Sequence, residues 1–203
     1  MSSRADDRLQ DEHAAIDRVL GGDRNAYALL VERYNGPLYR YLLRMVGRTD
    51  EAEDLAQEAF LRAYLSLASY DAGYRFSTWL FRIGTNLALN RIKAESKVVS
   101  LEGLHKGGER DEPPSELSDP SDESRPDLAA ERAELSEVVQ RCLQELPPDY
   151  RTVVTLRHIA DLSYAEISDS VGVPLNTVRS RLHRGRERLG ECLEARLPKE
   201  DRR

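Results

Sequence analysis

Five arginines lie within the seventeen residues VPLNTVRSRLHRGRERL, at positions 173–189, and the same stretch contains only one acidic residue, Glu187. Guanidinium groups hydrogen-bond to phosphates and to guanine edges, and an α-helix fits the major groove of DNA. The structural alternative is a solvated surface helix with salt bridges. Because one glutamate leaves most of these arginines unpaired, the segment predicts a helix that binds DNA.

The preceding residues predict that this helix is the second one of a helix-turn-helix. Ser163 and Glu166 have the spacing of a capping box at the start of the first helix, and Gly172 suits a tight turn with positive φ. Apolar side chains at helical spacing would form the core between the helices: Ile167, Val171, Val173, Val178 and Leu182. The side chains left to face DNA are Asn176, Thr177, Arg179, Ser180, His183 and Arg184.

A second group of residues is suited to binding unpaired bases. YDAGYRFSTW, at positions 70–79, contains four aromatic residues in a chain that is only 6% aromatic: Tyr70, Tyr74, Phe76 and Trp79. Aromatic rings stack on bases that have left a duplex. The alternative is that these rings fill a helical core, and we expect at least one of Phe76 and Trp79 to be structural.

A third group is polar and acidic. Asp54, Gln57 and Glu58 are spaced to share one helical face, opposite an apolar stripe that runs from Leu55 to Leu67. Such a face suits a contact with a basic protein partner, whereas the alternative is a face that only keeps the helix soluble.

Two helical blocks would carry these groups, so the predicted fold class is all-α. In the first block, from about residue 11 to 94, apolar residues recur at helical spacing from Tyr27 to Val46, Thr49 or Asp50 can cap the next helix, and Ser77 or Thr78 opens a third. In the second block, from residue 128, a helix with inward-facing Leu135, Val139, Cys142 and Leu146 ends at two prolines, and Asp149 is the expected cap of the helix that follows.

An acidic segment at residues 95–127 separates the blocks. Residues 94–137 contain 13 acidic and 5 basic side chains, a net charge of −8, in a chain whose formal net charge is −6. Residues 102–126 include four prolines and three glycines and show no apolar period. We therefore expect a flexible linker. The overall acidity belongs to this segment and does not argue against a nucleic-acid partner.

Several classes of protein are not indicated. The sequence shows no paired carboxylates, Cys-His nucleophile, phosphate-binding loop or metal-ligand spacing, so neither an enzyme nor a cofactor is expected. It has no apolar run that could span a membrane and no signal peptide, which predicts a cytoplasmic protein. Cys142 and Cys192 indicate neither a disulfide framework nor a zinc site; we expect small apolar side chains on helix faces, with a redox switch as the alternative.

The two blocks together resemble the extracytoplasmic-function (ECF) sigma factors of bacterial RNA polymerase. EAEDLAQEAFLRAY resembles region 2.2 of that family, and YRFSTWLFRIGTNLALNRIK resembles regions 2.3 and 2.4. The stretch from LPPDYRTVV to RGRERL, at positions 146–189, resembles regions 4.1 and 4.2. The resemblance implies a region 2-like domain at residues 1–94, a linker at 95–127 and a region 4-like domain at 128–203.

The resemblance also implies roles for the candidate residues. Asp54, Gln57 and Glu58 would dock on the clamp coiled coil of core RNA polymerase. The −10 promoter element would be recognised and melted by Tyr70, Tyr74, Arg75, Phe76, Trp79, Arg82, Asn86 and Asn90. The −35 element would be read by Arg157, Asn176, Thr177, Arg179, Ser180 and Arg184. Asn176 stands where many members have Gly and His183 where others have an aromatic residue. An anti-sigma factor is a further expected partner.

Two other interpretations stay open at this point. A stand-alone helix-turn-helix regulator would bind DNA without polymerase, and an adaptor would use the first block for a protein partner while its helix-turn-helix is vestigial.

Overall fold

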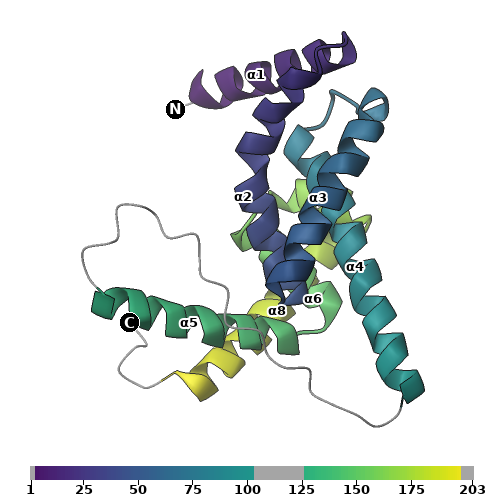
Figure 1. Ribbon diagram of the computed structural model, residues 1–203. Coiled ribbons are helices and arrows are strands. Elements are labelled where there is room, and N and C mark those ends of the chain that lie inside the picture. The colour runs from purple at the N-terminus through teal and green to yellow at the C-terminus, as the bar shows by residue number, and fades with distance from the viewer. Residues whose placement is uncertain (1–2, 103–125, 198–203) are drawn as a thin grey trace.

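The computed structural model describes the backbone of residues 3–102 and 126–197, and this part of the chain is helical and contains no strand (Figure 1). The predicted all-α class is confirmed. The α-helices, with two short 3₁₀ helices η1 and η2, are α1 Ser3–Leu20, η1 Arg24–Ala26, α2 Tyr27–Val46, α3 Thr49–Leu65, η2 Leu67–Ser69, α4 Phe76–Glu102, α5 Pro126–Glu145, α6 Pro148–His158, α7 Tyr164–Val171 and α8 Leu175–Arg196.

In the first block, α2, α3 and α4 run side by side and α1 crosses one end of α2 (Figure 1). Their inward faces follow the predicted apolar spacing, and α2 continues through Pro37 as one helix. The fully buried side chains of this bundle include Leu30, Leu38, Tyr41, Leu42, Met45, Phe76 and Leu80. The burial of these side chains removes the apolar stripes from water and holds the three helices together.

Four local predictions are wrong. Helix α4 begins at Phe76, before the predicted Ser77 or Thr78. Helix α3 begins at Thr49 after an Arg48 N-cap that makes no side-chain cap, and Asp50 instead pairs with Arg48 at 3.0 Å. Helix α6 has Pro147 as its N-cap and Asp149 in its first turn, because Pro148 fits the first turn, where no N–H partner is required. Leu135 is 47% exposed, since the amino-terminal half of α5 extends beyond α8 (Figure 1).

The predicted linker is shorter than expected at its amino-terminal side. Helix α4 continues to Glu102 and α5 begins at Pro126, so residues 95–102 and 126–127 are helical. The rest of the predicted linker, residues 103–125, lies outside the described residues.

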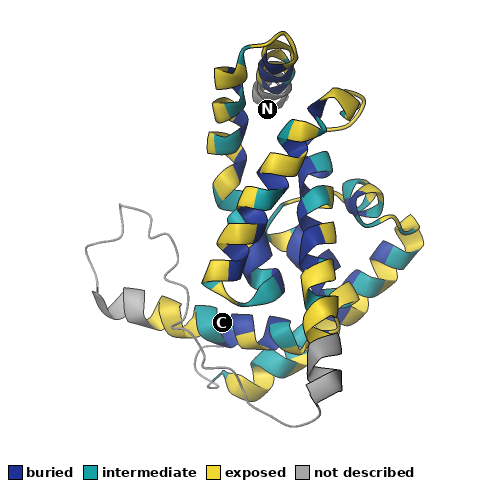
Figure 2. Ribbon diagram, turned by 45° about the vertical axis from the view of Figure 1, so that its right-hand side comes forward, coloured by how far each residue is buried: buried dark blue, intermediate teal, exposed yellow. Residues whose placement is uncertain are grey.

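The two blocks pack against each other. Helix α4 contacts α7, and α2 contacts both α5 and α6. One continuous set of buried apolar residues includes Leu38 and Phe81 of the first block and Leu156 and Ile167 of the second, and the buried sides of the helices face inward (Figure 2). The prediction of two blocks joined by a flexible linker did not anticipate this closed arrangement.

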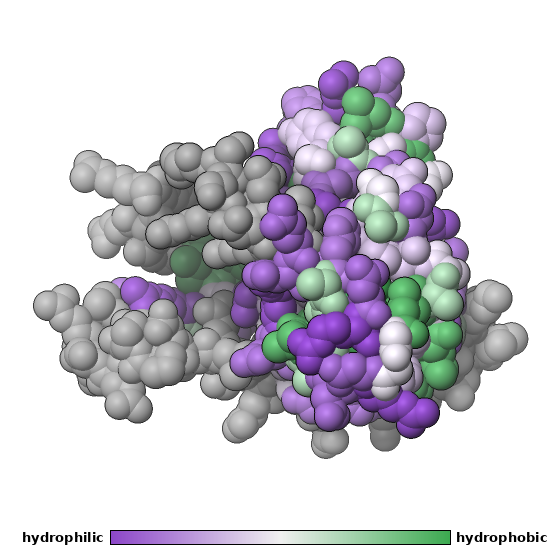
Figure 3. Space-filling view, turned by 90° about the horizontal axis from the view of Figure 1, so that it is seen from above, coloured by the Kyte–Doolittle hydropathy of each residue, from purple (hydrophilic) through white to green (hydrophobic). Residues whose placement is uncertain are grey.

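Seen from above, the described surface is mostly hydrophilic with scattered hydrophobic patches (Figure 3). Among the described residues, no helix combines the length and the apolar character that crossing a bilayer requires.

Candidate nucleic-acid interface

Helices α7 and α8 form the predicted helix-turn-helix. Ser163 Oγ accepts from the Glu166 backbone N–H at 3.2 Å and the Glu166 carboxylate accepts from the Ser163 N–H at 2.8 Å, which completes the capping box. Gly172 has φ 67°, and the Ser168 hydroxyl donates to the Val173 carbonyl at 2.6 Å across the turn. These local bonds fix the angle at which α8 leaves the turn.

Helix α8 buries Val178 and Leu182 and leaves its polar face open. Asn176, Arg179, Ser180, His183 and Arg184 are exposed and Thr177 is half-buried. The Ser180 hydroxyl donates to the Thr177 carbonyl at 3.0 Å. The side chains predicted to read DNA from this helix therefore lie together on one accessible face, here called the α8 polar face.

Other arginines of α8 have structural contacts. Arg181 pairs with Asp149 of α6, and the Arg188 guanidinium lies 5.3 Å from the centre of the Tyr150 ring. These contacts fasten α8 to α6. The sequence count of one acidic partner for five arginines was incomplete because Asp149 comes from another helix.

Arg157 lies on α6 and is not part of the α8 polar face. Its side chain contacts the turn that precedes α7. Its guanidinium donates to the Leu162 carbonyl at 2.9 Å and lies 3.5 Å from the Asp161 carboxylate. Asp161 has φ 50°, a left-handed conformation that is uncommon for residues other than glycine. Arg157 therefore stabilises this turn, and its contact with DNA remains a prediction.

The four predicted aromatic residues are not equivalent. Phe76 is fully buried, and its ring lies 5.6 Å from Tyr34, 5.9 Å from Tyr70 and 5.8 Å from Trp79. Burial also raises the pKa of Tyr70 to about 12. Tyr74 is 52% exposed. Phe76 thus belongs to the core, as one of the two alternatives predicted, and Tyr74 is the ring of this loop that solvent reaches most readily.

Polar side chains continue from this loop along α4. Arg82, Asn86 and Asn90 are exposed and recur every four residues, so they form one stripe. Arg75, at the start of the stripe, approaches the Glu166 carboxylate of α7 at 3.4 Å, and the Thr78 hydroxyl donates to the same carboxylate at 3.4 Å. Burial opposes ionisation of Glu166, but its hydrogen bonds with Ser163 and the charge of Arg75 lower its pKa overall.

On α3, Asp54 and Gln57 are exposed, whereas Glu58 is partly buried and pairs with Arg62 one turn later. The apolar stripe on the opposite face is buried, as the sequence predicts: Leu55, Ala56, Ala59, Phe60 and Ala63. The three predicted docking residues therefore share one solvent-facing surface.

Sequence reasoning missed the polar contact that joins the blocks at the carboxyl end of α2. The Gln140 amide donates to the Leu43 carbonyl at 3.2 Å and the Gln144 amide donates to the Arg44 carbonyl at 3.1 Å. The Arg151 guanidinium donates to the Met45 carbonyl and, within the second block, to the Gln144 carbonyl at 2.7 Å. We call Gln140, Gln144 and Arg151 the α2 cap. From the sequence, glutamine and arginine are expected to be exposed to solvent, so this contact was not predicted.

The prediction for the cysteines is wrong. Cys142 of α5 and Cys192 of α8 form a disulfide, with Cα atoms 5.7 Å apart and a separation of 50 positions along the chain. Their proximity depends on how α5 packs on α8, and the spacing alone did not indicate it.

Comparisons with known proteins match both blocks. The family model for sigma-70 region 2 matches residues 30–98, and the model for sigma-70 region 4 matches residues 136–189. A stand-alone helix-turn-helix regulator would not need a region 2, so this pair of matches argues against that interpretation.

Curated relatives cover nearly the whole chain. The chain is 41% identical to the ECF RNA polymerase sigma factor SigW of Bacillus subtilis (strain 168) over 178 residues, which is 88% of this chain and 94% of that protein. It is 35% identical to the ECF RNA polymerase sigma-E factor of Haemophilus influenzae (strain ATCC 51907 / DSM 11121 / KW20 / Rd) over 184 residues, which is 90% of this chain and 95% of that protein.

A similar fold is found in the solved structure of CnrH in complex with the cytosolic domain of CnrY, with a TM-score of 0.66, 22% identity and coverage of 92% of this chain and 99% of that one. RpoE of Bartonella quintana, crystallised with the anti-sigma factor NepR, gives a TM-score of 0.65 at 22% identity, over 84% of this chain and 98% of that one. Since sequence identity to the curated relatives extends through both blocks, this chain belongs to the ECF sigma factors of RNA polymerase.

Proposed function

We propose that the chain binds core RNA polymerase and directs it to promoters through two DNA contacts. The α8 polar face would read the −35 element in the major groove, with Asn176, Thr177, Arg179, Ser180 and Arg184 as contacts. The exposed α8 polar face, in a chain that also has a region 2, is the observation that carries this proposal. Arginine and asparagine at such positions suit guanine and adenine edges.

The first block would recognise and melt the −10 element. Tyr74 has the exposed ring that stacking on an unpaired base requires, while Arg75, Arg82, Asn86 and Asn90 supply donors along α4. Tyr70 and Trp79 are only partly buried and would contribute to the same DNA-binding surface. Phe76 would pack beneath them and stabilise their positions. The proposed domains are residues 1–94 and 128–203, with the last helix of the first domain, α4, extended to Glu102 and the first helix of the second, α5, beginning at Pro126.

The remaining expectations follow from this role. The chain would act in the cytoplasm, would catalyse no reaction of its own and would require no cofactor. We expect an anti-sigma factor to inhibit the chain. Of the two solved structures above, one contains RpoE bound to the anti-sigma factor NepR, and the other contains CnrH bound to the cytosolic domain of CnrY.

Binding both elements requires the closed arrangement to open. Promoter elements centred about 25 base pairs apart are separated by roughly 85 Å of duplex at about 3.4 Å per base pair. In the structure, Arg75 contacts Glu166, and the ten residues from Glu166 to Asn176 span at most about 36 Å. The polar stripe of α4, which runs from Arg75 to Asn90, and the α8 polar face are therefore too close together to reach both promoter elements at once. The contacts between the blocks must break when the chain binds a promoter.

The direct test is transcription in vitro by core RNA polymerase with and without the purified chain, with the transcripts sequenced to find their start sites. We expect defined start sites only in the presence of the chain. A gel-shift assay should show promoter binding with polymerase and weak binding without it; tight binding by the chain alone would contradict the proposal.

The docking surface is tested by changing Gln57→Ala and Glu58→Ala together. Both side chains lie on the accessible face of α3, so their loss should reduce co-purification with core polymerase without changing the helical content of the chain. The control is Glu32→Ala, an exposed acidic position on α2. If the double variant retains polymerase as well as the control does, the docking face lies elsewhere.

A further inference from the structure

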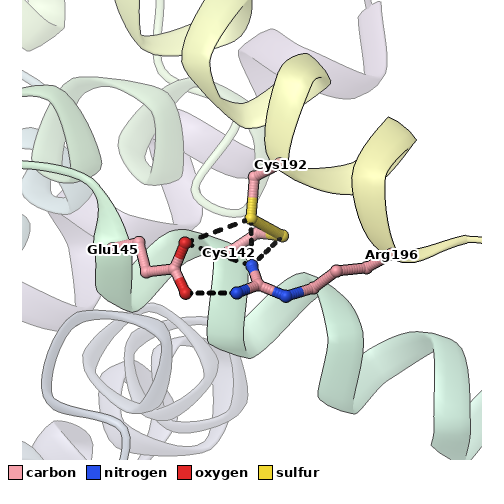
Figure 4. Close-up of a disulfide and its surroundings, with 4 residues drawn as sticks. All are labelled: Cys142, Glu145, Cys192 and Arg196. Carbon is pink, nitrogen blue, oxygen red and sulfur yellow. Dashed lines mark hydrogen bonds and ion pairs between the residues drawn. A yellow bond between two sulfur atoms is a disulfide. The ribbon is translucent and has the colours of Figure 1, made fainter.

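The disulfide between Cys142 and Cys192 has no part in the function proposed above (Figure 4). Cys142 is fully buried, whereas Cys192 at the carboxyl end of α8 is only partly buried. One sulfur is thus within reach of a small molecule and the other is protected. Thiol–disulfide exchange depends on this kind of access, because an incoming group must approach one sulfur in line with the bond that breaks.

Two charged side chains flank the sulfurs. An Arg196 nitrogen lies 3.4 Å from Cys142 Sγ and also contacts Cys192 Sγ. The same guanidinium pairs with Glu145 at 2.6 and 3.1 Å, and this pair lowers the pKa of the Glu145 carboxyl. Glu145 Oε2 lies 3.5 Å from Cys192 Sγ.

These neighbours act on a reduced thiol in opposite directions. A cation stabilises a thiolate and lowers the pKa of the thiol, whereas a carboxylate raises it. Because Arg196 contacts both sulfurs and Glu145 approaches only one, the guanidinium has the larger effect. The reduced pair is therefore disposed to react.

The disulfide also fixes α5 between two neighbours. Gln140 and Gln144 are four residues apart and share one face of α5, on which they cap the carboxyl end of α2. Cys142 lies on the opposite face and is bonded to α8. Loss of the disulfide removes the covalent link between α5 and α8 and leaves the Arg196–Glu145 pair to join these two helices.

We propose that Cys142 and Cys192 form a reversible redox site, activated by Arg196, whose oxidised form favours the closed arrangement of the two blocks. In the oxidising direction, the Cys192 thiolate attacks one sulfur of a small-molecule disulfide, and that S–S bond breaks to release one thiolate. The Cys142 thiolate then attacks the Cys192 sulfur of the mixed disulfide and releases the second. The two cysteine protons end on the two released thiols, so a dithiol and a small disulfide give a protein disulfide and two small thiols.

Reversibility suits the cytoplasmic location proposed above, where lasting structural disulfides are rare. The effect on transcription rests on the proposed function: the oxidised form would resist the opening that a promoter requires. The redox chemistry itself does not depend on that function.

The chemistry is tested by the rate at which iodoacetamide alkylates Cys192 in the reduced full-length chain at pH 7, measured by mass spectrometry. Arg196→Gln leaves the carboxylate beside the sulfur and should slow alkylation on the order of tenfold, the effect of one pKa unit on the thiolate fraction. Glu145→Gln should speed it, and Arg196→Lys should keep most of the original rate. Arg188→Gln, on the same helix but against Tyr150, is the matched control.

Equal alkylation rates in all these variants would contradict the proposed redox site. So would a reduced chain in which oxidised glutathione fails to restore the disulfide. The Arg196→Lys variant keeps the test valid if Arg196→Gln unfolds, because its retained rate separates charge from folding.

The conformational part is tested by small-angle X-ray scattering of the oxidised and reduced full-length chain. We expect a larger radius of gyration for the reduced chain, and the same larger value for Cys192→Ser in either redox buffer. Identical scattering of the oxidised and reduced forms would refute the link to closure. Neither assay uses DNA or polymerase, so failure here leaves the proposed transcription function untouched, and failed transcription leaves these results standing.

Discussion

Arg179 projects from the exposed face of α8, where its guanidinium contacts the Asn176 side chain at 3.5 Å. If Arg179 reads a base, Arg179→Ala should weaken transcription from a cognate promoter by about 1–3 kcal/mol, measured as transcript yield across polymerase concentrations. Arg24→Ala, which removes one exposed charge from η1, is the control for net charge. An unchanged yield for Arg179→Ala would remove this residue from the contacts.

His158, at the end of α6, lies 3.3 Å from Arg186 of α8. Burial, and then the charges of Arg186 and Arg157, lower the pKa of His158 below its ordinary value of 6.5. The folded chain therefore binds this proton less tightly than the unfolded chain does. The contribution of His158 to the free energy of unfolding is therefore fully present above pH 6.5. It declines as the pH falls below that value.

Replacing this residue, His158→Gln, should flatten the dependence of the unfolding free energy on pH between pH 7.5 and 6.0, measured by urea unfolding. His183→Gln, an exposed histidine on α8, is the control. A slope equal to that of the unmodified chain would show that His158 contributes nothing to the pH dependence.

At the scale of helices, α8 crosses α6 at Gly185. A Cβ at this position would lie 2.7 Å from Val154 Cγ2, which is too close for a side chain unless Val154 or one of the two helices shifts. The close approach of the two helices places the α8 polar face relative to α6. Nothing in the sequence distinguishes this glycine from Gly190, five residues later in the same helix.

Gly185→Ala should therefore lower the unfolding free energy by about 1–3 kcal/mol, because an overpacked contact forces the helices apart. Gly190→Ala is the matched control: nothing lies within 4 Å of its Cβ position, and alanine should stabilise the helix by about 0.5–1 kcal/mol. Thermal unfolding of the two variants compares them directly, and a Gly185→Ala variant as stable as Gly190→Ala would contradict the packing argument.

For the whole molecule, the α2 cap is the contact whose loss should matter most. Burial lowers the pKa of Arg151 to about 10, so the guanidinium stays charged at neutral pH while it donates to carbonyls of both blocks. Without it, the Gln144 carbonyl would lose this donor, and the Met45 carbonyl would keep only the longer 3.4 Å bond from the Gln144 amide.

Arg151→Met should thus lower the unfolding free energy by roughly 2 kcal/mol or more, since each buried polar group left without a partner costs about 1–3 kcal/mol. Urea unfolding measures this, and the matched control is Arg184→Met, at an exposed position of α8. Equal stability of the two variants would mean that water replaces Arg151 in the cap.

The sequence by itself determined those features that depend on neighbouring residues. The capping box at Ser163, the turn at Gly172 and the apolar periods of α2, α3 and α8 were all predicted, because they are set by local hydrogen bonds and by helical repeat. The two family resemblances were likewise visible from the motifs, and the comparisons confirmed them. The roles of the individual DNA-facing and docking residues stay predictions.

Only the tertiary structure decided which residues from distant segments meet. The Cys142–Cys192 bond, the α2 cap and the contact of Arg75 with Glu166 each join residues 50 or more positions apart. Burial of Phe76 likewise depends on Tyr34 from another helix, and it decided between the two roles predicted for that ring. Such pairs depend on how helices dock, which apolar spacing within one helix does not specify.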